Sequence, residues 1–134
     1  MDIPRDQLLL ASYIEQGLAY KSKGKEDQAT ENSKFWFHDL QDDQMVGEMN
    51  DDLKSVMKGY YVCVLGFGLI GKYGSPMNAK EALKKIRYPV DKNSMILGLG
   101  ISEELFNSVN ELHQDEGLSA KRIVNTLRNR LLIN

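Results

Sequence analysis

Cysteine, histidine and proline are scarce in this chain of 134 residues. The single cysteine, Cys63, excludes a disulfide within one chain, and its apolar neighbours Val62 and Val64 predict a buried, unreactive thiol with a raised pKa. The two histidines, His38 and His113, have no cysteine or second histidine at metal-ligand spacing. No nucleophile lies beside His38 either. We therefore predict no metal, no cofactor and no catalytic residue.

Long apolar runs and a strong net charge are also missing. The longest uncharged apolar stretch, residues 59–71, is too short to cross a bilayer. The apolar residues 8–11 lack the basic flank and the length of a signal peptide. A formal net charge of −2 favours neither nucleic acid nor a membrane surface as a partner. These absences predict a cytoplasmic protein without a membrane partner.

What the chain does contain is 42% apolar residues, most of them at helical spacing. This content and length are typical of one ordinary domain. Apolar residues recur every three or four positions in residues 9–19, 45–60 and 123–131. A further helix is predicted over about 26–40, and others follow capping signals. The expected N-caps are Asn78, Ser102 and Ser119, and the expected helix ends are marked by Pro89 and Gly117. We predict a mainly α fold, a single domain over residues 1–134 of packed antiparallel helical hairpins.

Three glycines in the middle of the chain allow two interpretations. Gly66, Gly68 and Gly71 have the G-x-G-x-x-G spacing of a dinucleotide-binding turn, and Asp91 would be the acid that binds the ribose. Proline at Pro76 would interrupt the helix that this turn requires. The sequence after Asp91 has a helical pattern that leaves no further parallel strands. We therefore favour packing within a helical hairpin over a dinucleotide-binding enzyme.

Two stretches of the chain resemble the tetratricopeptide repeat, a helical hairpin that is typical of protein-binding proteins. In residues 12–40 the matching positions are Tyr13, Gly17, Tyr20, Gly24 and Ala29. In residues 60–89 they are Leu65, Gly66, Leu69, Gly74, Ala79, Leu83 and Pro89. The resemblance covers about half of the chain. It implies that the small residues allow paired helices to cross closely.

Charge is distributed unevenly along the chain. Residues 39–52 contain six acids and no lysine or arginine. Such a segment would complement a basic surface on a partner protein, and the adjacent aromatic residues would anchor the contact. We predict a non-enzymatic protein-binding module, such as a small adaptor, inhibitor or immunity-type protein. The predicted contact residues are Trp36, Phe37, Asp39, Asp42, Asp43, Glu48, Asp51 and Asp52.

The C-terminal segment supports an alternative function. Residues 121–134 contain four bases and no acid, and the residues before them partly match a helix-turn-helix. In a small DNA-binding regulator these bases would contact phosphates. The helix-turn-helix positions are Leu112, Gly117, Leu118, Ser119 and Ile123. The phosphate-contacting residues would be Lys121, Arg122, Arg128 and Arg130.

Overall fold

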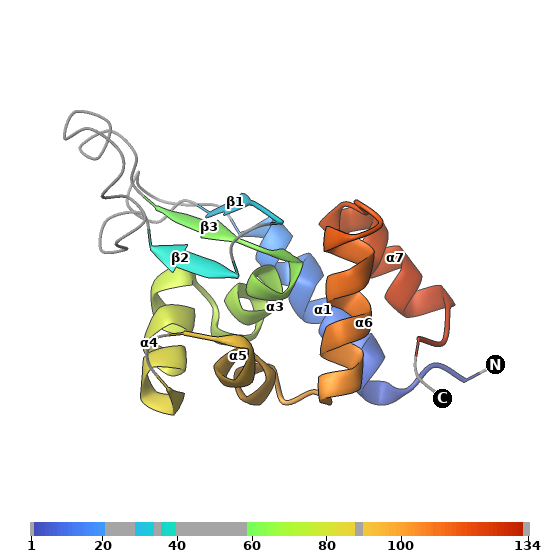
Figure 1. Cartoon of the computed structure of the whole chain (residues 1–134), viewed down its shortest axis with the longest axis horizontal. Helices are drawn as coiled ribbons and strands as arrows, with labels where there is room; N and C mark the ends of the chain where they lie inside the picture. Colours follow the sequence, from blue (N-terminus) through green and yellow to red (C-terminus); the bar gives the residue numbers. More distant parts are fainter. Residues whose placement is uncertain (1, 21–28, 34–35, 40–58, 88–89, 133–134) are drawn as a thin grey trace.

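The fold is mainly helical, as the apolar spacing predicts. The computed structural model describes residues 2–20, 29–33, 36–39, 59–87 and 90–132 (Figure 1). In these residues it contains six helices and one small sheet. The helices are α1 (Arg5–Ala19), α3 (Val64–Tyr73), α4 (Pro76–Ile86), α5 (Lys92–Leu99), α6 (Glu103–Gln114) and α7 (Ala120–Asn129). The strands are β1 (Ala29–Glu31), β2 (Phe37–Asp39) and β3 (Tyr60–Val62).

Helix α3 lies at the centre of the fold because nearly all of its residues are apolar or glycine. Residues 64–70 are all buried, and α1, α4, α5 and α6 pack against them. Figure 1 shows the sheet on one side of α3, with α4 and α5 at one end of the molecule and α6 and α7 at the other. Helix α7 also packs against α1, so the core extends continuously from the first helix to the last.

The three spaced glycines are part of helix packing. Strand β3 ends at Val62 and α3 begins at Val64, so Gly66, Gly68 and Gly71 lie inside the helix and not in a turn before it. A Cβ at Gly71 would overlap the carbonyl oxygen of Tyr13 in α1. Their position within a packed helix agrees with the packing interpretation, and the absence of nucleotide binding stays a prediction.

The predicted helix over residues 26–40 is wrong, because this region contains strands β1 and β2. Strand β3 lies between them, parallel to β1 with Ala29 opposite Tyr60, and antiparallel to β2 with Phe37 opposite Val62. The side chain of Phe37 packs on Tyr60 with ring centroids 5.5 Å apart. Cross-strand packing of this kind overrides local helical spacing. Of the predicted helix over 45–60, residues 45–58 lie outside the described residues, and Tyr60 belongs to β3.

Two of the expected helical hairpins are present. Helices α3 and α4 are joined through Gly74, which has a φ of 96°, and α6 and α7 are joined through a turn that contains Gly117, with a φ of 70°. The predicted caps Ser102 and Ser119 start α6 and α7, whereas α4 starts one turn before the predicted Asn78, at Ser75. Helix α1 packs against α3 and α7, so the first predicted hairpin does not form. Membership of the tetratricopeptide family stays a prediction.

Candidate partner-binding surface

Helix α6 is amphipathic, and its position is fixed by its first turn and by its apolar face. The hydroxyl of Ser102 accepts a hydrogen bond from the backbone N–H of Leu105 at 3.1 Å, which satisfies one of the free amides at the helix start. Leu105, Phe106, Val109 and Leu112 are buried on the inner face. Packing of these residues fixes which side of α6 points to solvent.

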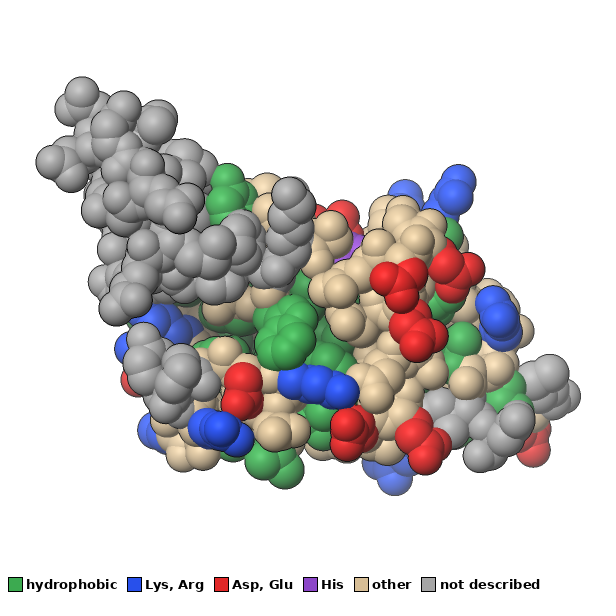
Figure 2. Space-filling view, in the orientation of Figure 1, with side chains coloured by type: hydrophobic (Ala, Val, Ile, Leu, Met, Phe, Trp, Pro, Cys, Tyr) green, Lys and Arg blue, Asp and Glu red, His purple; other side chains and the backbone are tan. Residues whose placement is uncertain are grey.

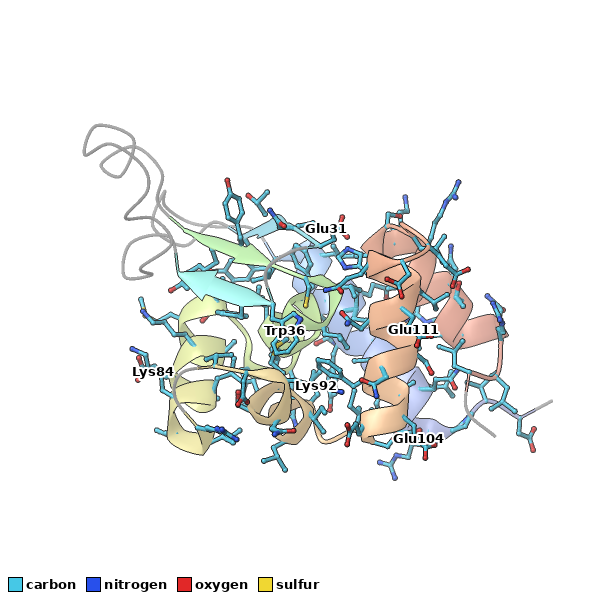
Figure 3. The ribbon with its side chains drawn as sticks, viewed as in Figure 1. Glu31, Trp36, Lys84, Lys92, Glu104 and Glu111 are labelled. Atoms are coloured by element: carbon cyan, nitrogen blue, oxygen red, sulfur yellow. The ribbon has the colours of Figure 1, made fainter. Side chains whose placement is uncertain are left out.

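The outer side of α6 is acidic. All the acids of the helix and of the turn that follows are exposed, and residues 93–120 contain no lysine or arginine. We define the acidic face of α6 as Glu103, Glu104, Glu111, Asp115 and Glu116. Figure 2 shows acidic side chains along this helix, and Figure 3 labels Glu104 and Glu111 on it. The acidic surface predicted from the sequence lies in residues 39–52, and this second group is not among the predicted contact residues.

One acid of this face is paired, and the others are available to a partner. Glu103 forms an ion pair with Lys92, with a distance of 3.2 Å between Oε1 and Nζ. Across the described part of the chain, Glu104, Glu111 and Asp115 take part in no ion pair. Because they are spaced by whole turns, these three carboxylates lie along one stripe of the helix.

Trp36 lies between the sheet and α6, and Figure 3 shows α6 between it and the labelled Glu104 and Glu111. Its ring meets the ring of Phe106 edge to face, with centroids 6.2 Å apart and planes at 86°. Its carbonyl oxygen accepts a hydrogen bond from the backbone N–H of Cys63 at 3.1 Å. Trp36 is partly buried, and at its position in Figure 3 the space-filling view of Figure 2 shows apolar atoms at the surface. Trp36 is therefore an aromatic residue that packs on Phe106 and is still partly exposed.

Among the other predicted contact residues, only the side chain of Phe37 is described, and it does not join Trp36 on this surface. Phe37 is only 8% exposed and contributes to the core. Asp39 is the last residue of β2. Five predicted acids lie outside the described residues: Asp42, Asp43, Glu48, Asp51 and Asp52.

The four predicted phosphate-contacting bases do not form one continuous group. Lys121 and Arg122 are exposed at the start of α7, and Arg130 lies at the other end. The Arg128 guanidinium donates two hydrogen bonds to the Glu15 carboxylate, at 2.8 and 3.1 Å. These bonds hold the pKa of Glu15 below its ordinary value. Arg128 is therefore already engaged within the protein.

The thiol of Cys63 is buried at the N-terminal end of α3. Burial raises its pKa to about 11, and nearby backbone amides, including that of Gly66, oppose this shift only in part. The thiol therefore stays protonated at neutral pH and is a poor nucleophile, in line with the expectation from its apolar neighbours.

Comparisons of the chain with models of known protein families, with curated proteins and with solved structures found no match. Among the described residues, none of the helices combines the length and the apolar character needed to cross a bilayer. Within the same part of the chain, no three side chains of His, Cys, Asp or Glu are grouped as metal ligands.

Proposed function

We propose that this chain is a cytoplasmic, non-enzymatic protein-binding module that covers a basic surface on a partner, as a small adaptor, inhibitor or immunity-type protein does. The observation that carries the proposal is that the partly exposed Trp36 and the acidic face of α6 lie on the same side of the molecule, the side seen in Figure 2. Both belong to well-packed parts of the fold, so the surface is preorganised for binding.

The two parts of this surface would have different roles. The exposed carboxylates Glu104, Glu111 and Asp115 would attract a basic partner and increase the rate of association. Trp36 would fill an apolar pocket between the basic residues and slow dissociation, because buried tryptophans contribute strongly to binding. The role of the acids in residues 39–52 stays a prediction.

The DNA-binding alternative has weaker support. Arg128 is paired with Glu15, and the acidic residues Asp115 and Glu116 lie in the turn that leads into α7. These two carboxylates would repel the phosphates that Lys121 and the other exposed bases of α7 would contact.

Changes to the acidic face should slow association and reduce its dependence on salt. The charge variant replaces Glu104, Glu111, Asp115 and Glu116 by their amides, and we expect a fall in the association rate of about tenfold at low salt. The measurement is surface binding to the partner that the unaltered chain captures from its native cell. A matched variant with Lys121→Gln and Arg122→Gln should bind as the unaltered chain does. Replacement of Asp42, Asp43, Asp51 and Asp52 by Asn tests the sequence-predicted segment separately.

Trp36→Ala should weaken the same complex by about thirtyfold or more, mainly through faster dissociation. Thermal unfolding by circular dichroism establishes that the variant is folded before its binding is measured. If neither this variant nor the charge variant changes binding, the proposed surface is wrong. Loss of binding only in the Lys121 and Arg122 variant, with duplex DNA as the captured partner, would instead support the DNA-binding alternative.

A further inference from the structure

Glu31 connects the sheet to the α6–α7 hairpin. Its side chain extends from the last residue of β1, and Figure 3 shows it at the end of the strand that faces α6. The carboxylate oxygen Oε1 accepts a hydrogen bond at 2.8 Å from the backbone N–H of Ala120, the first residue of α7. The same oxygen lies 3.4 Å from Nε2 of His113, near the end of α6. One strand residue therefore contacts both helices of the hairpin.

The buried environment of His113 disfavours a positive charge on its ring. Its side chain is only 5% exposed, and the second ring nitrogen, Nδ1, is buried without a hydrogen-bond partner. Oδ1 of Asn110, one turn earlier in α6, is also buried without a partner. A proton on the imidazole would add a charge and a donor to this enclosed site.

The charged and polar groups around His113 shift its pKa in opposite directions. On β1, the Glu31 carboxylate favours the protonated ring. On α7, the amides of the helix N-terminus oppose it, since a cation is unfavourable there. At the start of α3, Cys63 stays neutral and contributes no charge at pH 5 to 7. Burial has the largest effect, and the pKa of His113 is lowered below its ordinary value of 6.5.

We propose that Glu31 and His113 form a proton-sensitive latch: neutral His113 allows the α6–α7 hairpin to stay docked on β1, and proton uptake by His113 releases it. In the released state the imidazolium is hydrated and the Glu31 carboxylate leaves the α7 N-terminus. A second contact on the same side, from Nε2 of Gln114 to the carbonyl oxygen of Ser33 at 2.9 Å, is lost in the same motion. The latch operates whether or not the proposed partner-binding surface is correct.

The sign of the effect follows from the two protonation states. Because docking lowers the pKa of His113, the released state binds the proton more tightly than the docked state. Docking is therefore strongest above pH 6.5 and weakens as the pH falls through and below this value. For each pKa unit by which docking lowers the pKa of His113, the population of the released state increases by up to about tenfold once the released histidine is protonated.

The test is hydrogen exchange measured by mass spectrometry at pH 7 and pH 5.5, corrected for the intrinsic effect of pH on exchange. In the unaltered chain, we expect peptides from α6 and α7 to exchange several-fold faster at pH 5.5, whereas peptides from α4 change little. His113→Gln should abolish this difference between pH values. His38→Gln removes the other histidine of the chain and should leave the difference intact.

Direct titration by NMR provides an independent measurement. The pKa of His113 should lie below 6.5, and Glu31→Gln should lower it further while keeping an acceptor oxygen for Ala120. Three results would overturn the latch: a His113 pKa at or above 6.5, no response of that pKa to Glu31→Gln, or acid loosening of α6 and α7 that persists in His113→Gln. The NMR titration of Glu31→Gln also decides the question if His113→Gln does not fold.

Discussion

Replacement of Gly71 by alanine should cost about 3 kcal/mol or more of the free energy of unfolding, whereas Gly68→Ala should change it by less than about 1 kcal/mol. A Cβ at Gly71 would overlap the backbone carbonyl oxygen of Tyr13. Backbone inside a helix moves only if the helix moves, so α1 and α3 would have to separate. A domain of this size has a total stability on the order of 5–15 kcal/mol, so the loss is a large fraction of it.

Gly68 is the matched control because it belongs to the same helix and the same glycine motif. A Cβ there would lie 3.2 Å from Cδ2 of Leu99, 3.3 Å from Cδ1 of Leu10 and 3.5 Å from Cγ1 of Ile14. The two nearest atoms are terminal methyl groups of leucine side chains, which can shift by a few tenths of an ångström, and the distance to Ile14 is an ordinary van der Waals contact. Alanine is also favoured over glycine inside a helix by about 1 kcal/mol, which offsets the crowding.

Urea unfolding followed by circular dichroism measures the free energy of unfolding of both variants. Calorimetric titration with NAD, NADP and ATP measures whether either variant, or the unaltered chain, binds a nucleotide. In a dinucleotide-binding turn the second glycine is the one that approaches the pyrophosphate, so Gly68→Ala would be the damaging change. Equal destabilisation by both variants would contradict the packing role that we assign to Gly71. Micromolar nucleotide binding that Gly68→Ala abolishes would revive the dinucleotide interpretation.

The helices that were predicted correctly have strong local signals. Helices α6 and α7 begin after the N-capping serines Ser102 and Ser119, and each carries an apolar stripe of four buried residues. Such signals depend only on neighbours within one or two turns, and a single sequence contains them in full.

The sheet and α5 were not predicted because their signals are short or ambiguous. Each strand has three residues, too few to show alternation, and β1 pairs with β3 across a long stretch of the sequence. Helix α5 has only eight residues, too few for a clear apolar stripe, between its N-cap Asp91 and Gly100. Its capping box uses Asp91, which would be the ribose-binding acid in the dinucleotide interpretation.

The candidate site was only partly predictable for the same reason. Trp36 was identified because a lone tryptophan beside acids is conspicuous in the sequence. The acidic face of α6 was missed because its acids are separated by apolar residues and become one surface only when the helix is packed. The contact of Glu31 with His113 and Ala120 joins residues that are distant in the sequence, and no local pattern marks it.

Gln7 in α1 is a second buried polar group without a local signal, and its replacement by glutamate should cost about 3 kcal/mol at pH 7. Gln7 is 1% exposed. Its Nε2 donates hydrogen bonds to the carbonyl oxygens of Leu127 at 2.9 Å and Arg130 at 2.6 Å, and its Oε1 accepts one from the N–H of Leu132 at 3.2 Å. The amide thus binds the free carbonyl groups at the C-terminal end of α7 to α1.

Glutamate has the same size as glutamine but cannot donate these bonds when it is ionised. At pH 7 a carboxylate at position 7 would face two carbonyl oxygens in a buried site, which adds electrostatic repulsion to the two lost hydrogen bonds. Gln16→Glu is the matched control, because Gln16 is exposed on the same helix and the variant has the same charge. We expect the control to change stability by less than about 0.5 kcal/mol.

The pH dependence separates a lost hydrogen bond from a general loosening of the core. Burial raises the pKa of the introduced carboxyl above its unfolded value of about 4.3, so the folded protein prefers the protonated form. The penalty relative to the unaltered chain is therefore complete above the raised pKa and decreases as the pH falls below it, because the protonated acid regains one donor. Urea unfolding of Gln7→Glu and of the unaltered chain between pH 7 and pH 4 measures this difference. A penalty that stays constant over that range would show that the amide of Gln7 does not hold the end of α7 through these hydrogen bonds.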